Sequence, residues 1–447
     1  MAHAAGRKWW VVGLAAAAGV FALVYFAGGS RDPQETPRRI QSQLANIRGL
    51  PFKREVIVQM QSPEEFARSI QAEAQRLDRS GDYEKVTRML GLLASDETLN
   101  IKEVEKPSTM KTVDGYYDPD SGRVLLVRKP STDALDLLYA RQLYHALLDQ
   151  HFDLKTYLPE HIQDGALNGD ERFARKMVVE GESLYASVMW SMRYQNGREP
   201  TETLLSAFVN KLNEKDQMES LVATPAFTDP RISPSLGNTR RVARKEPGDG
   251  PLFLSEIARG MDRDGLTFVH AVHWKGWSEV EKLYKDSPPV STEQVLHPEK
   301  WFAGEHPVKI QWPDLKTNEL LEDWELLAED VLGELQWRIV FKVHGFSPLM
   351  GSAPGGWNGD RYAVFKRRGG NDLLMLMYTA WDTETAATEF ASAYRVLVKE
   401  KYTAGAPPPM RILEKGRKVV IVEGGDESSL ESLMRFAEGA QEIAPTG

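Results

Sequence analysis

The chain has 447 residues, 42% hydrophobic and 9% aromatic, which is enough apolar surface for a sizeable core and about two or three domains. Its formal net charge is −9, with no long basic run beyond the first residues, which argues against nucleic acid as a partner. It contains no cysteine, which excludes disulfides and thiol catalysis.

Residues 9–27, WWVVGLAAAAGVFALVYFA, form an apolar run without a charged side chain. A run of ~20 such residues crosses a bilayer as a helix, and the two leading tryptophans suit an interfacial aromatic belt. We therefore predict a retained single-pass anchor at 9–27, with residues 1–8 cytoplasmic and the bulk of the chain periplasmic or extracellular. A cleaved signal peptide is the alternative, but its apolar core is usually ~7–15 residues. Cleavage after Ala27 would also place the large Tyr25 at the −3 position, where a small residue is needed.

The segment after this run is polar and rich in arginine and proline, so residues 28–51 are predicted to be a stalk. EVIVQM at 55–60 predicts a short strand. Residues 113–128 predict two strands around the turn DPDSG at 118–122.

A helix is predicted over residues 137–153, LLYARQLYHALLDQHFD, because apolar residues recur at helical spacing without glycine or proline. One of its faces is therefore expected to be buried. A second helix is predicted over residues 169–190.

Part of the first helix, YHALLDQHFDL, resembles the text that follows the H-E-L-x segment in a family of bacterial and archaeal gluzincin-like surface proteins related to zinc metallopeptidases. The resemblance extends over residues 113–424. Its further segments, in order, are DERFARKMVVEGES (170–183), PPVSTEQVLHPEKW (288–301), GWNGDRY (356–362) and WDTETAATEFA (381–391).

The resemblance implies a zinc site that has lost its chemistry. In the H-E-x-x-H segment two histidines bind zinc and the glutamate activates water. Here His145 falls on the second histidine, Arg141 on the first, Gln142 on the glutamate, and Glu180 on the third ligand. A guanidinium only donates hydrogen bonds and an amide has no titratable proton. We therefore predict no catalytic residue, vestigial His145 and Glu180, and an Arg141–Glu180 salt bridge in place of zinc.

A displaced zinc site is the alternative for an active hydrolase. His145, His151, His161 and Glu180 lie near one another in the sequence. However, His145 and His151 are six positions apart, about 240° around a helix, so they cannot share an ion within one helix.

The resemblance also suggests a cleft. In zincins an edge strand beside the active-site helix pairs with an extended peptide, which makes Tyr116 and Tyr117 possible cleft residues; an ordinary hairpin is the alternative. Glu293 and His297, four positions apart on a predicted helix, either face this cleft or hold the geometry of the lobes.

The last part of the chain, residues 316–447, is predicted to be a separate α+β region. The glycine-rich turn at 355–359 lacks the lysine and serine or threonine of a phosphate loop. The predicted elements are a helix at 320–341, strands at 361–366, 372–378 and 418–423, and a helix at 384–399.

The predicted fold is therefore α+β: a zincin-like, mainly helical domain at 52–315 with a small edge sheet, two lobes divided at about 223–250, the C-terminal region and one transmembrane helix. The predicted function is a membrane-anchored, catalytically inactive, metallopeptidase-like binding or assembly subunit without a cofactor. Its expected partner is a protein or a membrane complex. The alternatives are a hydrolase with displaced zinc and a structural subunit of a membrane complex.

Overall fold

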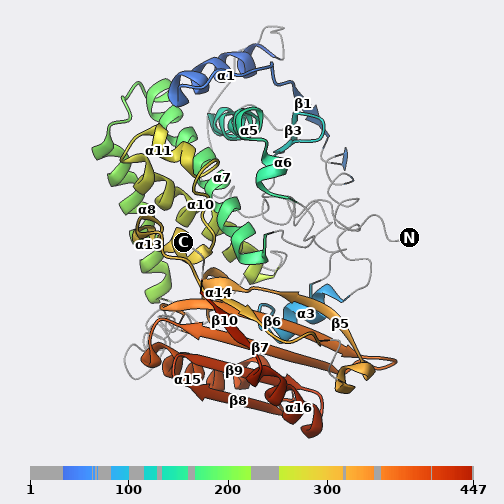
Figure 1. Cartoon of the computed structure of the whole chain (residues 1–447). Coiled ribbons are helices and arrows are strands. Elements are labelled where there is room, and N and C mark those ends of the chain that lie inside the picture. The colour runs from blue at the N-terminus through green and yellow to red at the C-terminus, as the bar shows by residue number, and fades with distance from the viewer. Residues whose placement is uncertain are drawn as a thin grey trace, which may run out of the picture.

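The computed structural model describes the chain in several stretches (Figure 1). They are residues 34–62, 64–65, 68, 82–99, 115–127, 133–159, 167–222, 251–315, 319–346, 354–403 and 405–444. A mainly helical part fills the upper half of Figure 1, and a five-stranded sheet with its helices fills the lower half. The α+β class predicted from the sequence is confirmed.

The helical part is built around α5, α7 and α10, and α7 packs against both of the others. The helices predicted at 137–153 and 169–190 are confirmed as α5 and α7. The bounds of the three are α5 Asp133–Phe152, α7 Gly169–Trp190 and α10 Leu252–His273. The other helices that precede the C-terminal sheet in the chain are α1 Glu35–Arg48, α3 Tyr83–Met89, α6 Leu154–Tyr157, η2 Ser191–Gln195, α8 Glu202–Val222, α11 Trp277–Lys282, α12 Thr292–Leu296 and α13 Pro298–Ala303.

Two glycines set the close crossing of α7 and α10. A Cβ added to Gly181 would lie 2.1 Å from the carbonyl carbon of Gly265, and one added to Gly265 would lie 2.2 Å from the Met177 oxygen. No larger residue fits at either position without moving a helix. Glu180, the neighbour of Gly181, is thereby brought close to α10.

A three-stranded sheet lies beside α5. β1 (Val58–Gln61) runs parallel to β3 (Arg123–Val127), and β2 (Gly115–Asp118) runs antiparallel to β3. The hairpin predicted around residues 118–122 is thus confirmed. β2 is the edge strand of this sheet on the side of α5.

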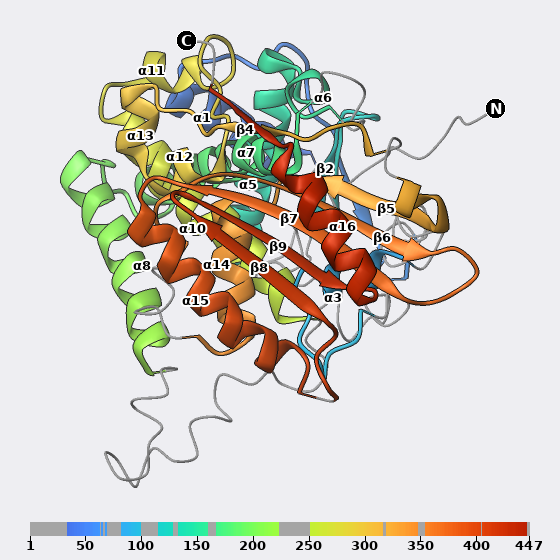
Figure 2. The same ribbon diagram turned by 60° about the horizontal axis from the view of Figure 1, so that its bottom comes forward.

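The C-terminal sheet has the strand order β5-β6-β7-β9-β8 and is antiparallel throughout. Side chains alternate along β7, so Met375 and Met377 join the core of the helical part, whereas Leu374 and Leu376 join a second core on the other face. α16 covers that second face (Figure 2). The elements are η5 Glu319–Asp323, β5 Trp324–Asp330, α14 Gly333–Val343, β6 Trp357–Arg367, β7 Leu373–Trp381, α15 Glu384–Lys401, β8 Met410–Lys415, β9 Lys418–Gly424 and α16 Glu427–Glu438, with β4 Lys309–Gln311 paired to β10 Gln441–Ile443.

The predicted stalk is wrong over most of its length. Residues 35–48 form α1, which packs on α5 and α7 through Ile40 and Leu44, both fully buried. Arg48 Nε lies 2.8 Å from Glu182 Oε1 on α7, and both side chains are buried. The helix is mostly polar, but its three large aliphatic residues recur at helical spacing and therefore form one buried face.

The predicted transmembrane helix is also corrected. None of the described helices is long and apolar enough to cross a bilayer, and residues 9–27 lie outside the described residues. Long α7, for example, carries the charged residues Lys176, Glu180 and Glu182, each costly in hydrocarbon. The described part of the chain is therefore α+β.

A third correction concerns the helix predicted over residues 320–341. The structure divides this stretch into η5, the edge strand β5, and α14. The apolar spacing of ELLEDWELLAED suits a helix, but pairing of β5 with β6 overrides that local preference. β8 and α16 complete the region and were not among the predicted elements.

Candidate functional site

The helix α5 brings the predicted residues Arg141, Gln142 and His145 to one buried region of the helical part. His145 and Gln142 are buried, and the side chain of Arg141 is only 13% exposed. Glu180 reaches the same region from α7 and is also buried. The convergence of Arg141, His145 and Glu180 that the resemblance implied is therefore found in the structure.

Arg141 lies where two carboxylates meet. Its Nη2 is 2.9 Å from Glu180 Oε2, which confirms the predicted salt bridge. Nη2 also donates to Asp262 Oδ1 on α10, and Nη1 donates to Asp262 Oδ2 at 3.3 Å. Burial by itself would lower the pKa of Arg141, but Asp262 and Glu180 outweigh it and raise the pKa above its ordinary value. The guanidinium is a permanent cation at this point.

His145 approaches the same carboxylate, with Nε2 3.2 Å from Glu180 Oε2. Burial favours the neutral acid, but the charges of His145 and Arg141 outweigh burial and hold the pKa of Glu180 well below its usual range. Glu180 is therefore ionised, and His145 donates Nε2–H to it. The buried Nδ1 of His145 has no hydrogen-bond partner among the described residues.

Gln142, which the resemblance aligns with a water-activating glutamate, fastens the edge strand to α5. Its Oε1 accepts the backbone N–H of Tyr117 at 3.1 Å, and the Tyr117 hydroxyl donates to Asp149 Oδ2 at 2.6 Å. Strand β2 is thus fastened to α5 at two points. Of the two predicted cleft tyrosines, Tyr117 is buried against α5, while Tyr116 is half-buried.

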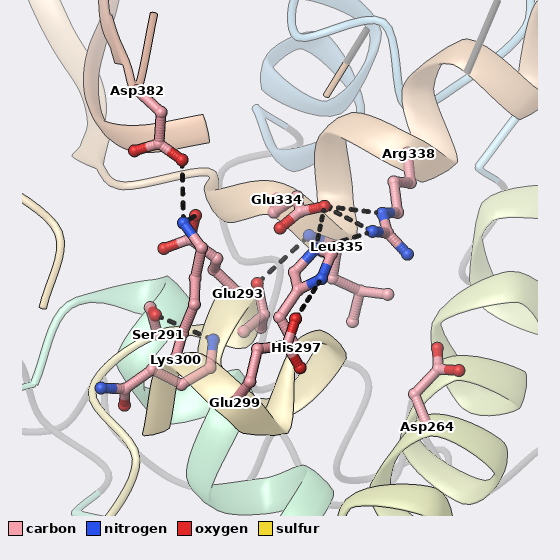
Figure 3. Close-up of polar contacts among 12 residues, drawn as sticks. Asp264, Ser291, Glu293, His297, Glu299, Lys300, Glu334, Leu335, Arg338 and Asp382 are labelled. Atoms are coloured by element: carbon pink, nitrogen blue, oxygen red, sulfur yellow. Dashed lines mark hydrogen bonds and ion pairs between the residues drawn. The ribbon is translucent and has the colours of Figure 1, made fainter. Parts of the chain in front are cut away.

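The segment 288–301 forms a second polar cluster, at the junction with the C-terminal sheet (Figure 3). The Nζ atom of Lys300 lies 2.7 Å from Glu293 Oε1, 2.6 Å from Glu305 Oε1 and 2.9 Å from Asp382 Oδ2. The carboxylate oxygens themselves lie within 4.8 Å of one another. The Lys300 ammonium therefore lies among three carboxylates. A hard divalent cation such as calcium is bound by the same kind of oxygen ligands.

His297 faces a different partner from Glu293. Its Nε2 lies 3.1 Å from Glu334 Oε1 on α14. The Nη2 atom of Arg338 is within hydrogen-bond distance of both His297 Nε2 and Glu334 Oε1 (Figure 3). The hydrogen bond to Glu334 raises the pKa of His297, and burial raises the pKa of Glu293 to about 7 despite Lys300. His297 directly, and Glu293 through Lys300, connect α12 and α13 to the C-terminal region, which follows both predicted lobes.

The same segment reaches the start of α7. Thr292 donates its backbone N–H and its hydroxyl to the buried carboxylate of Asp170, and its hydroxyl accepts the N–H of Leu335 at 3.1 Å. Burial raises the pKa of Asp170 well above its usual range. The segment 288–301 thereby joins α7, α12 and α14 through buried side chains.

The two clusters do not form one site. No hydrogen bond or ion pair between described residues joins Glu293 or His297 to Arg141, His145 or Glu180. The sequence did not indicate Asp262 or Lys300 as members of the clusters. Asp262 lies 121 positions from Arg141 and has no local motif, whereas Lys300 stands inside the segment 288–301 that the resemblance had already marked.

The donor set does not fit zinc at His145. Arg141 stands where a ligand is needed, and His151 contacts the Pro51 oxygen instead, while His161 lies outside the described residues. Within the described stretches, the donor atoms that gather closely enough for an ion are those of Glu293, Glu305 and Asp382. All three are oxygen ligands, which favour calcium, magnesium or manganese over zinc.

Comparison with known proteins gives one match. A family model described as a domain of unknown function, DUF8575, matches residues 323–434. These residues cover all five strands of the C-terminal sheet together with α14 and α15. No curated protein and no solved structure matches the chain. The matched region contains Glu334, Arg338 and Asp382 of the second cluster but neither α5 nor α7.

Proposed function

We propose that this chain is a catalytically inactive, metallopeptidase-like protein that acts by binding or assembling with another protein. The observation that carries the proposal is the position of the Arg141 guanidinium between Glu180 and Asp262. Removing zinc from such a site would leave buried carboxylates without a counter-charge, which is costly. Arg141 supplies a fixed positive charge that cannot activate water, so the helices stay together while hydrolysis is lost.

Gln142 supports the same proposal. A general base needs a titratable group with access to water, and an amide has none. Here the amide oxygen is instead used to fasten the edge strand β2. A fold can retain its binding surfaces after its catalytic residues have changed, and binding is then the function that remains.

The test is metal content together with peptide hydrolysis. Wild-type protein should retain almost no zinc after dialysis, measured by elemental mass spectrometry. The double variant Arg141→His with Gln142→Glu restores the missing ligand and base and should retain about one zinc per chain. The triple variant that adds His145→Ala is the matched control and should lose that zinc.

Two results would contradict the proposal. Zinc bound by the wild type at about one per chain, lost on chelation together with a peptide-hydrolysing activity, would mean an active enzyme. Absence of zinc from the double variant, with the fold intact by circular dichroism, would mean that Arg141 does not stand at a former metal position.

A further inference from the structure

Five polar side chains link the helices α7, α8 and α10, and none of them belongs to the two clusters described above. α10 packs against both α7 and α8 in the helical part (Figure 1). The Tyr185 cluster, as we name it, consists of Tyr185 on α7, Glu202 and Ser206 on α8, and His270 and His273 on α10. Tyr185 is 1% exposed, so its hydroxyl depends on partners within the protein.

The Tyr185 hydroxyl lies between two imidazoles. Its oxygen is 3.3 Å from His270 Nδ1 and 3.1 Å from His273 Nδ1. Because a hydroxyl has one hydrogen, it donates to only one of these nitrogens. The other Nδ1 must therefore carry a hydrogen and donate it to the hydroxyl oxygen.

The contacts with α8 decide which imidazole donates. His270 Nε2 lies 3.2 Å from Ser206 Oγ, and the Ser206 hydroxyl donates to Glu202 Oε1 at 3.4 Å. Since the hydrogen of Ser206 points to Glu202, its oxygen accepts Nε2–H of His270. A neutral imidazole carries one N–H, so His270 Nδ1 accepts from Tyr185 and His273 Nδ1 donates to it. The hydrogen bonds thus form one directed chain from His273 to Glu202.

This chain requires both imidazoles to be neutral. A proton added at His270 Nδ1 turns both of its nitrogens into donors, and the buried Tyr185 hydroxyl then loses its acceptor, which is costly. A proton added to His273 leaves its Nδ1–H in place but brings a second positive charge toward Arg48.

The charged groups that face the two imidazoles come from other helices. Glu202 Oε1 lies 3.4 Å from His270 Nε2, and Arg48 of α1, itself paired with Glu182, faces His273. Burial lowers the pKa of His270, although Glu202 opposes this. Burial, together with the charges of His270 and Arg48, lowers the pKa of His273 from 6.5 to about 4. Both imidazoles are therefore neutral at pH 7.

We propose that the Tyr185 cluster is a pH-sensitive latch, which holds the end of α10 to α7 while both imidazoles are neutral and releases Tyr185 when they take up protons. The side chains of His270 and Glu202 are 14% and 33% exposed, so protons reach the cluster without unfolding. A base whose pKa is lower in the folded chain stabilises the fold fully above pH 6.5, and this contribution is lost as the pH falls toward 4. Acid therefore loosens the C-terminal end of α10.

The experiment is amide hydrogen exchange of the full chain, with each rate divided by the intrinsic rate at the same pH. Protection of residues 266–273 in the wild type should fall by about tenfold between pH ~7 and ~4.5. The variant that combines His270→Asn with His273→Asn keeps an amide oxygen and an amide N–H for Tyr185 but cannot take up a proton. Its protection should not show this fall.

The matched control is His306→Asn, which removes an exposed histidine and should keep the wild-type fall. Tyr185→Phe removes the hydroxyl and should show low protection at both pH values. A wild-type protection that does not change with pH, or the same fall in the double variant, would overturn the latch. Nuclear magnetic resonance titration of the wild type tests it without any variant: His270 and His273 should titrate below their ordinary pKa, and titration of both at 6.5 would also overturn it.

Discussion

Arg141 on α5 and Glu180 on α7 form a buried ion pair, with Nη2 and Oε2 2.9 Å apart. Asp262 on α10 joins the same guanidinium, so three helices meet at one cation. Under the function proposed above, this arginine takes the place of a metal ion and balances the charge of the two carboxylates.

The first prediction concerns this pair. Arg141→Ala leaves Glu180 and Asp262 without their cation in a buried place, so the free energy of unfolding should fall by about 3 kcal/mol. Urea unfolding followed by circular dichroism measures the change. Arg395→Ala removes an exposed ion pair instead and should cost less than about 1 kcal/mol.

A double-mutant cycle separates the pair from general loss of packing. Adding Glu180→Gln to Arg141→Ala removes one of the two unpaired charges, so the double variant should be less destabilised than the sum of the single variants. Additive free energies would contradict a direct Arg141–Glu180 interaction. A melting temperature unchanged by Arg141→Ala would contradict burial of the pair.

The second prediction concerns α1. Arg48 and Glu182 are almost fully buried, and the Arg48 guanidinium also lies 4.6 Å from the centre of the Trp277 ring. Arg48→Met keeps much of the side-chain volume but leaves Glu182 unpaired, which should cost about 3–5 kcal/mol. The control is Arg38→Met on the same helix, whose pair with Glu55 is half exposed. Equal stability of the two variants in urea would mean that α1 is not part of the core.

The third prediction is a pH dependence that arises from Glu293. Burial raises the pKa of its carboxyl from 4.5 to about 7 in the folded chain. Such a group stabilises the fold fully below pH 4.5, and this contribution is lost as the pH rises through 7. The free energy of unfolding should therefore decline over this interval more steeply in the wild type than in Glu293→Gln.

Urea unfolding at several pH values between about 4 and 8 measures this difference. Other groups that titrate in the interval are shared by the two proteins, so the difference reports on Glu293. Glu389→Gln, at an exposed position of α15, should keep the wild-type slope. Parallel curves for the wild type and Glu293→Gln would show that Glu293 titrates normally.

The fourth prediction concerns the cage around Lys300. Lys300→Ala removes the ammonium from Glu293, Glu305 and Asp382, and the repulsion among them should lower the free energy of unfolding by about 2 kcal/mol. Millimolar calcium or manganese should restore part of the melting temperature, because both ions take oxygen ligands.

The comparison for this variant is Lys285→Ala, which removes an exposed lysine from a pair with Glu281. Its melting temperature should respond to neither ion beyond the wild-type response. If calcium and manganese also leave Lys300→Ala unchanged, the three carboxylates do not form a cation cage.

Sequence by itself determined the helices α5 and α7, because their apolar spacing is a local signal that extends over several turns. The resemblance of the segment around His145 placed Arg141 opposite Glu180, and the structure confirms their contact. The hairpin of β2 and β3 could also be predicted from the sequence, because its turn residues lie within one short stretch.

Tertiary structure alone decided three other features. Asp262 joins Arg141 only because Gly181 and Gly265 let α7 and α10 cross closely, and no local pattern records a contact over 121 positions. Residues 324–330 form a strand because β6 offers its edge, against their helical spacing. The apolar face of α1 is a local signal, but its Arg48 meets Glu182, 134 positions away, only in the packed structure. Local periodicity encodes elements, whereas the partners of buried charges depend on how distant elements pack.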